Sequence, residues 1–145
     1  MSMEKTTVLV KSEDLNHHET LFAGRMAEWL VEASFMGASA VFGKYGEKEH
    51  LVSVEVHRLK YMGSARNGDI ITFYSQALKA GRSSLSVYTK AVLNRTDKII
   101  SEGYITYVCL DGEGKVIPHG IEIDSNQNPD FEQQVKELEL LQSRV

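Results

Sequence analysis

The 145-residue chain has one cysteine and two prolines. A single cysteine excludes an intrachain disulfide and any metal site built from several cysteines. Cys109 lies in the apolar run Tyr107-Val108-Cys109-Leu110, which predicts a small buried hydrophobic residue. The chain also lacks an excess of positive charge: its net charge of −4 excludes a general nucleic-acid-binding surface, so an anionic ligand would need a local basic site. Residues 1–11 contain no apolar run of the kind found in signal peptides, and no stretch suits a membrane span, so we expect a cytoplasmic protein.

The composition is typical of a soluble globular protein. Hydrophobic residues make up 42% of the chain and charged residues 25%. A chain of this length can bury a substantial core, so we predict a single domain over residues 1–145, with its core at about 5–118 and a helical tail at about 128–143.

The order of apolar patterns predicts an α+β fold. One proline-free segment, Leu21–Val41, is apolar nearly all round and rich in small residues, so we expect a long helix enclosed by protein that other backbone approaches closely. A second helix is predicted after Asn128 as N-cap, with Pro129 in its first position, and should dock on this subunit or on a partner. β-Prone runs separated by turn residues predict strands at Thr6–Val10, Leu51–His57, Asp69–Ala80, Ser83–Leu93 and Lys98–Leu110.

Together these elements predict an antiparallel sheet of about five strands wrapped round one central helix, plus a C-terminal helix. Such a sheet has exposed edges. Because edge strands readily pair with another copy, we expect a homodimer.

The junction between the polar loop and the long helix is the most informative stretch. It runs Asn16-His17-His18-Glu19-Thr20-Leu21-Phe22-Ala23-Gly24 and should direct unpaired backbone N–H groups, with the positive end of the helix dipole, at the loop. Glu32 lies about two turns into the helix. A carboxylate to accept a proton, an amide to orient and N–H donors for an oxyanion are suited to attack on a carbonyl.

Four landmarks resemble the hotdog-fold acyl-CoA thioesterases over roughly residues 5–118. They are Asn16-x-x-x-Thr20-Leu21-Phe22-Ala23-Gly24 opening a helix, Asn67-Gly68-Asp69 and Gly81-Arg82-Ser83-Ser84 each starting a strand, and Asp111-x-x-Gly114-Lys115 at the end. The resemblance implies hydrolysis of an acyl-CoA to free acid and CoA. It implies a homodimer, or a tetramer or hexamer of dimers. It implies no metal, and no cofactor other than the CoA of the substrate.

The same resemblance implies a site shared between subunits, with Asn16 and the helix start from one chain and Glu32 from its partner. Glu32 would activate water, Asn16 would orient the water or the thioester, and the Gly24 amide would hold the oxyanion, while one loop imidazole (His17) would line the site. Phe22 through Gly24 would offer N–H groups, and the acyl chain would run near Trp29 and Phe35. The sequence departs from the family at one position. The family's usual carboxylate would fall at Val31, one residue before Glu32.

For the CoA phosphates, the best candidate is Gly81-Arg82-Ser83-Ser84, since a guanidinium and hydroxyl groups suit phosphate oxygens. His17 and His18 should point opposite ways on an extended loop, and no third metal ligand is suitably spaced.

Other functions and plainer roles stay open. A hotdog dehydratase or hydratase could pair either loop histidine with Glu32, and a non-catalytic acyl-CoA-binding module would follow if Val31 means that the base was lost. Asn16 could merely cap a loop, and Glu32 could belong to a surface stripe with Arg25 and Glu28.

Overall fold

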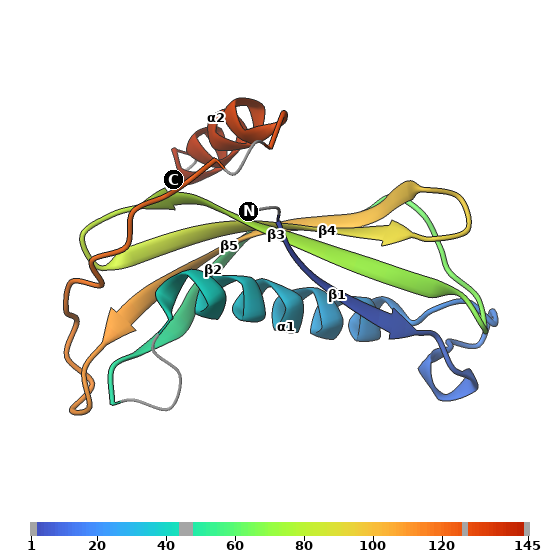
Figure 1. Cartoon of the computed structure of the whole chain (residues 1–145). Coiled ribbons are helices and arrows are strands. Elements are labelled where there is room, and N and C mark those ends of the chain that lie inside the picture. The colour runs from blue at the N-terminus through green and yellow to red at the C-terminus, as the bar shows by residue number, and fades with distance from the viewer. Residues whose placement is uncertain (1–2, 44–47, 126–127, 144–145) are drawn as a thin grey trace.

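A computed structural model describes residues 3–43, 48–125 and 128–143. It contains one five-stranded sheet with a long helix on one face and a short helix on the other (Figure 1). In chain order the elements are β1 (Glu4–Leu9), a short 3-10 helix (Ser12–Asp14), α1 (Ala23–Phe42), β2 (His50–Tyr61), β3 (Ile70–Ala80), β4 (Ser84–Leu93), β5 (Lys98–Leu110) and α2 (Phe131–Gln142). The strand order is β1-β3-β4-β5-β2 and every pairing is antiparallel, so β1 and β2 form the edges.

Small residues on α1 allow the helix to lie close to the sheet, as predicted. A Cβ added to Gly37 would lie 2.5 Å from Ser75 Cβ, which leaves no room for a side chain. Ser75 Oγ donates to the Ala33 carbonyl at 3.1 Å and so ties β3 to α1. The buried face of α1 packs with Cys109, which is fully buried as expected, in one apolar cluster.

The opposite face of α1 is open in the single chain. Phe35 and Met36 are 42% and 45% exposed. The prediction that protein encloses the helix all round is therefore wrong for one chain, because no described element of the chain covers this face. An apolar face left open on a long helix is a surface for another molecule or another copy.

α2 covers the outer face of the sheet. Leu138 is fully buried against Tyr88 and Tyr104, and Arg58 of β2 forms a 2.6 Å ion pair with Glu137. Burial against α2 raises the pKa of Tyr104 to about 12. Neither helix, within the part of the chain described, is long and apolar enough to cross a bilayer.

Several boundaries differ from the prediction. α2 begins at Phe131 with Asp130 as N-cap, whereas Asn128 and Pro129 lie before it. Asn128 instead folds the preceding turn, because its Oδ1 accepts the Asp130 N–H at 3.1 Å and its Nδ2 donates to Gln134 at 2.9 Å. β2 extends to Tyr61 rather than ending at His57. Two irregularities in its pairing with β5 interrupt the alternation of apolar and polar residues, so the second half of the strand lacks the pattern that predicted the first half.

Candidate active site at the start of the central helix

Asn16 closes the loop that leads into α1. Its Oδ1 accepts the backbone N–H groups of His18 and Thr20, at 2.8 and 3.2 Å, and its Nδ2 donates to Thr20 Oγ1 at 3.1 Å. Glu19 adopts a left-handed conformation with φ of 63°, which the turn requires. Asn16 therefore has the structural role of capping the loop. Its acceptor is fully used, while Nδ2 carries a second N–H.

The two loop histidines lie together rather than on opposite sides. The ring centroids of His17 and His18 are 3.9 Å apart and the rings are tilted by 42°. The prediction was wrong because the pair occupies a tight turn, held by Asn16, and not an extended chain. Both side chains are exposed. No three His, Cys, Asp or Glu side chains gather into a metal site in residues 3–43, 48–125 and 128–143.

The first turn of α1 presents two backbone N–H groups. Phe22, the N-cap, makes no side-chain capping bond, and its own N–H donates to the Asp14 carbonyl at 2.9 Å. The expectation that Phe22 also offers a free amide is therefore wrong. The amides of Ala23 and Gly24 remain: they precede the first residues that can bond within the helix, and no partner for them is found in the described residues. They form an anion-binding position at the positive end of the helix dipole.

The ring of Phe22 lies over Gly24. A Cβ on Gly24 would come within 2.5 Å of Phe22 Cε2, so a larger residue here would push the ring aside. The Phe22 side chain is 55% exposed. An exposed aromatic ring beside two unpaired N–H groups can contact a ligand held there.

Asp14 is a site residue that sequence reasoning missed. Its carboxylate is only 4% exposed, lies 3.2 Å from Arg25 Nε and accepts the Lys11 N–H at 2.9 Å. Arg25 also contacts Glu28 at 3.3 Å. The signal in the sequence was Arg25 itself, because a cation in the first turn of a helix is unfavourable unless an anion compensates it.

Glu32 lies in the open face of α1. Its carboxylate is exposed, forms no ion pair within the described part of the chain, and so does not extend the Arg25–Glu28 pair. It borders a hollow of about 370 Å³ whose other walls are Val31, Phe35, Met36, Ser53 and Tyr107. Trp29, in contrast, packs against the core and does not line this hollow. A carboxylate beside a mostly apolar hollow suits a base next to an acyl group.

Tyr107 forms the floor of that hollow. It is fully buried and donates to Ser34 Oγ at 2.8 Å. Burial raises the pKa of Tyr107 to about 12. The Phe35 ring meets it edge to face at 5.9 Å.

One chain does not bring Glu32 to the helix start. Gly24 and Glu32 are eight residues apart, which is roughly 12 Å along a helix axis. A base must be within hydrogen-bond reach of the proton that it takes. The Gly81–Ser84 turn is farther still, because it joins β3 to β4 at the end of the sheet near the C-terminus of α1 (Figure 1).

The Gly81–Ser84 turn itself is well braced. The Gly81 N–H donates to the Ser84 carbonyl at 2.9 Å, and the Ser84 carbonyl also accepts from Nε2 of buried His119 at 2.7 Å. His119 Nδ1 accepts the Ile121 N–H at 2.9 Å, so the imidazole is a structural brace. Arg82 points out from this turn with an exposed side chain.

These features match one protein family. The sequence profile of the thioesterase superfamily matches residues 18–97, more than half of the 145-residue chain. The chain belongs to the thioesterase superfamily, and its fold is the hotdog fold that the four landmarks predicted.

Two curated relatives are similar over most of the chain. An uncharacterized acyl-CoA thioester hydrolase of Haemophilus influenzae is 24% identical over 114 residues, which are 74% of this chain and 71% of the relative. A protein of the same description from Bacillus subtilis is 22% identical over 109 residues, which are 72% of this chain and 60% of that relative.

Solved structures share the fold. The acyl-CoA hydrolase of Staphylococcus aureus, in complex with butyryl-CoA, CoA and CoA disulfide, is 22% identical with a TM-score of 0.79, covering 97% of this chain and 84% of that one. A hexameric acyl-CoA thioesterase is 21% identical with a TM-score of 0.81, covering 96% and 87% of the two chains.

Proposed function

We propose that this protein is an acyl-CoA thioesterase that hydrolyses its substrate to a free acid and CoA. The observation that carries the proposal is the pair of unpaired amides at Ala23 and Gly24, beneath the exposed ring of Phe22. Two N–H donors at a helix start can stabilise the oxyanion that forms when a thioester carbonyl is attacked. Membership of the thioesterase superfamily and the names of both curated relatives support this chemistry.

In the proposed mechanism Glu32 takes a proton from water, and the resulting hydroxide attacks the thioester carbon. The carbonyl oxygen becomes an oxyanion between the Ala23 and Gly24 amides. The C–S bond then breaks and the CoA thiolate leaves, with the proton on Glu32 available to it. Asn16 orients the thioester or the water through its remaining Nδ2 N–H, because its Oδ1 is committed to the loop. His17 borders the entrance. The mechanism requires no metal and no resident cofactor.

A second copy of the chain is needed to assemble these groups, because the helix start and Glu32 are roughly 12 Å apart along the helix axis. The open face of α1 and the edge strand β2 supply the surface for it. Val54 and Val56 on β2 are 55% and 48% exposed, and Ser53 of the same strand borders the hollow beside Phe35 and Met36. Edge pairing through β2 would cover this apolar area and would set Glu32 against the helix start of the partner subunit. That a thioesterase of this fold is hexameric supports a dimer-based assembly.

The same arrangement brings the turn that carries Arg82 toward the shared site. If the partner's Gly24 lies against Glu32, the two helices are related by a two-fold axis that passes near Glu28. The partner's helix then runs antiparallel to α1. The partner's Asn16 loop then approaches the C-terminal half of α1, which is the end where Gly81, Arg82, Ser83 and Ser84 lie (Figure 1). We propose that this turn contacts the CoA phosphates. An acyl-CoA substrate also fits the expected place of the enzyme in the cytoplasm.

The test is incubation of the purified protein with a panel of acyl-CoAs and a thiol-trapping dye. Release of free CoA supports the proposal. Gain or loss of water across a double bond without free CoA would identify a dehydratase or hydratase, with His17 or His18 as partner of Glu32. Saturable binding with neither reaction would identify an acyl-CoA-binding module, the outcome that Val31 at the family's carboxylate position would explain.

A further inference from the structure

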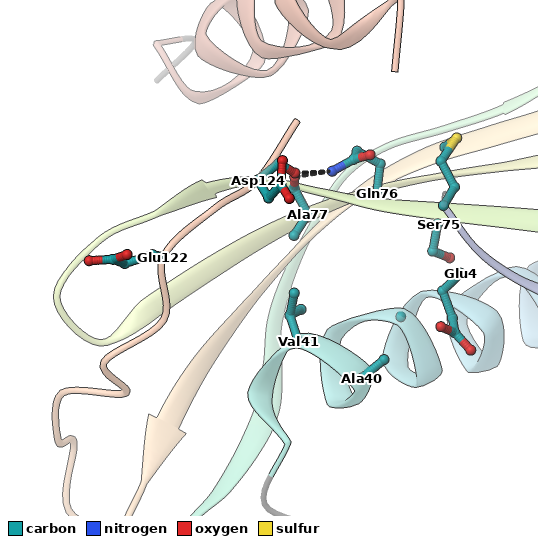
Figure 2. A pocket seen from close by; sticks show the side chains of 10 residues that line it. Glu4, Ala40, Val41, Ser75, Gln76, Ala77, Glu122 and Asp124 are labelled. Atoms are coloured by element: carbon teal, nitrogen blue, oxygen red, sulfur yellow. Dashed lines mark hydrogen bonds between the residues drawn. The ribbon is translucent and has the colours of Figure 1, made fainter. Parts of the chain in front are cut away.

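The two ends of α1 are fixed to the rest of the chain in different ways. The C-terminal half borders a cavity of about 200 Å³, and Ala40 and Val41 of the helix belong to its lining (Figure 2). At the other end, the hydroxyl of Tyr61 donates a hydrogen bond of 2.8 Å to the Ala23 carbonyl. Tyr61 is the last residue of β2 and lies 38 residues beyond Ala23 in the chain. The helix start, which carries the proposed oxyanion position, is thus held by a side chain from a distant strand.

Tyr61 is itself firmly placed, because β5 holds the residues on both sides of it. The Lys60 carbonyl accepts a hydrogen bond from Ser101 Oγ at 2.8 Å, and the Met62 N–H donates to the Ile100 carbonyl at 2.9 Å. The phenol ring therefore projects from a fixed backbone. Its hydroxyl can hold the first helical carbonyl in place rather than follow its movements.

The chain that follows β2 also supports the loop before the helix, but only through backbone contacts. The Leu21 N–H donates to the Ala65 carbonyl at 2.8 Å. Among the side chains of the described residues, Tyr61 alone bonds to the backbone of Ala23 or Gly24. A single hydroxyl thus contacts the turn whose two amides we assign to the oxyanion.

The position of this bond has a chemical consequence for Gly24. The Ala23 carbonyl and the Gly24 N–H are the two ends of one peptide group. A carbonyl oxygen has two lone pairs, so it can accept the Tyr61 hydroxyl in addition to the N–H four residues further along the helix. A donor on the carbonyl polarises the peptide group and strengthens its N–H as a donor, typically by about 10–30% for each bond. The Tyr61 bond therefore acts on the very amide that the proposed mechanism directs at the oxyanion.

We infer that Tyr61 is a positioning residue for thioester hydrolysis, an inference that rests on the proposed function. Its hydroxyl fixes the orientation of the peptide group between Ala23 and Gly24 and strengthens the Gly24 N–H toward the developing oxyanion. Tyr61 acts through that amide and transfers no proton. The contact lies within one chain, so it does not depend on how two copies pair.

Tyr61→Phe tests the inference, because it removes the hydroxyl and keeps the ring. The side chain is 47% exposed, so we expect the variant to fold, and its melting temperature checks this. We expect kcat for an acyl-CoA to fall about three- to tenfold with KM unchanged, because the oxyanion forms only after the ground state. The loss should be smaller than the 10²–10³ that removal of a whole oxyanion donor typically costs, since the Gly24 N–H remains.

Tyr74→Phe is the matched control. Tyr74 lies on β3, where its ring contacts Lys5 and Lys90, and its hydroxyl forms no hydrogen bond within the described part of the chain. This variant should keep the kcat of the wild type. If Tyr61→Phe does not fold, 3-fluorotyrosine at position 61 replaces it. Fluorine makes the hydroxyl a stronger donor, so kcat should rise at a pH where the phenol stays protonated, and an unchanged kcat would contradict the inference.

NMR of the free protein examines the contact without any reaction. Tyr61→Phe should shift the signals of the Gly24 amide nitrogen and the Ala23 carbonyl carbon, and Tyr74→Phe should leave both in place. Unmoved signals, or hydrolysis by the wild type with an unchanged kcat in Tyr61→Phe, would overturn this inference alone. Absence of CoA release by the wild type would overturn the proposed function, and this inference with it.

Discussion

The buried carboxylate of Asp14 lies 3.2 Å from the guanidinium of Arg25 and fixes the first turn of α1 to the preceding 3-10 helix. The same residue accepts the Phe22 N–H through its backbone carbonyl. Asp14 thus holds both the N-cap and the third residue of the helix whose amides we assign to the oxyanion. Removing its charge should disturb the site without touching the substrate.

Asp14→Asn should therefore lower both stability and activity. The change removes the buried partner of Arg25 and leaves only the exposed Glu28 as its counter-charge at the positive end of the helix, so we expect a loss of about 1–3 kcal/mol in the free energy of unfolding. Urea denaturation measures this, and kcat/KM for an acyl-CoA should fall in parallel. Glu13→Gln is the matched control, since Glu13 lies in the same 3-10 helix but is exposed. Equal effects of the two substitutions would show that the contact between Asp14 and Arg25 has no special role.

Glu32→Gln should act on catalysis and leave the fold intact. Glu32 is exposed and makes no ion pair in the described residues, so its removal costs little stability. As general base it should be worth about 10²–10⁴ in kcat. Stopped assays with a thiol-trapping dye measure the rate, and the melting temperature checks the fold. Glu132→Gln, at an exposed position of α2 away from the proposed site, is the control. Near-full activity of Glu32→Gln would remove Glu32 from the mechanism.

Mixing two inactive variants tests whether the site is shared. Asn16→Asp keeps the acceptor that holds the loop but loses the Nδ2 donor, so it is preferable to alanine. Combined with Glu32→Gln after subunit exchange, it should regain part of the activity, because mixed dimers contain one intact site. Sedimentation should show a dimer or larger assembly at micromolar concentration. A folded monomer, or no rescue after proven exchange, would contradict the shared site.

The Asn67-Gly68-Asp69 landmark predicts a dependence of stability on acid. Its hydrogen bond to Arg95 and the backbone N–H of Arg66 hold the pKa of Asp69 below its usual value of 3.8. A lowered pKa in the folded state means that ionised Asp69 stabilises the fold above about pH 3.8, and that this contribution is lost as the pH falls through the folded pKa. Arg95 is partly exposed, so screening by solvent should keep the effect small.

Denaturation between pH 5 and pH 2 measures this contribution. Asp69→Asn should be less stable at neutral pH and should flatten the acid limb of the stability curve, while Asp97→Asn, at an exposed turn position, should keep it. An unchanged acid limb in Asp69→Asn would assign acid sensitivity to other carboxylates.

The order of elements could be predicted because local signals agree with the fold. The proline-free run that became α1 and the turns at Asn67–Asp69 and Gly81–Ser84 are fixed by residues close in sequence. What failed depends on contacts between distant residues. Asp14 forms an ion pair with Arg25, and its backbone carbonyl accepts the Phe22 N–H; neither partner is identified by a local signal in the sequence. The unpaired amides of Ala23 and Gly24 follow from the geometry of any helix start and were predictable. The distance from Gly24 to Glu32 follows from the number of helical turns between them.

Arg82→Ala tests the proposed contact with the CoA phosphates. Arg82 is exposed on a hairpin turn, so its contact with a phosphate should contribute less than about 1 kcal/mol and should weaken further with salt. The loss should raise KM and leave kcat nearly unchanged, because a phosphate far from the thioester is bound equally in the ground and transition states. The control is Lys98→Ala, because Lys98 is exposed at the start of β5, next to the hairpin at the other end of β4. An N-acetylcysteamine thioester has no phosphate, so with this substrate the Arg82 variant should match the wild type. If KM for an acyl-CoA at low salt is the same with and without Arg82, the nucleotide lies elsewhere, and Lys60, Arg66 and Lys79 become the candidates.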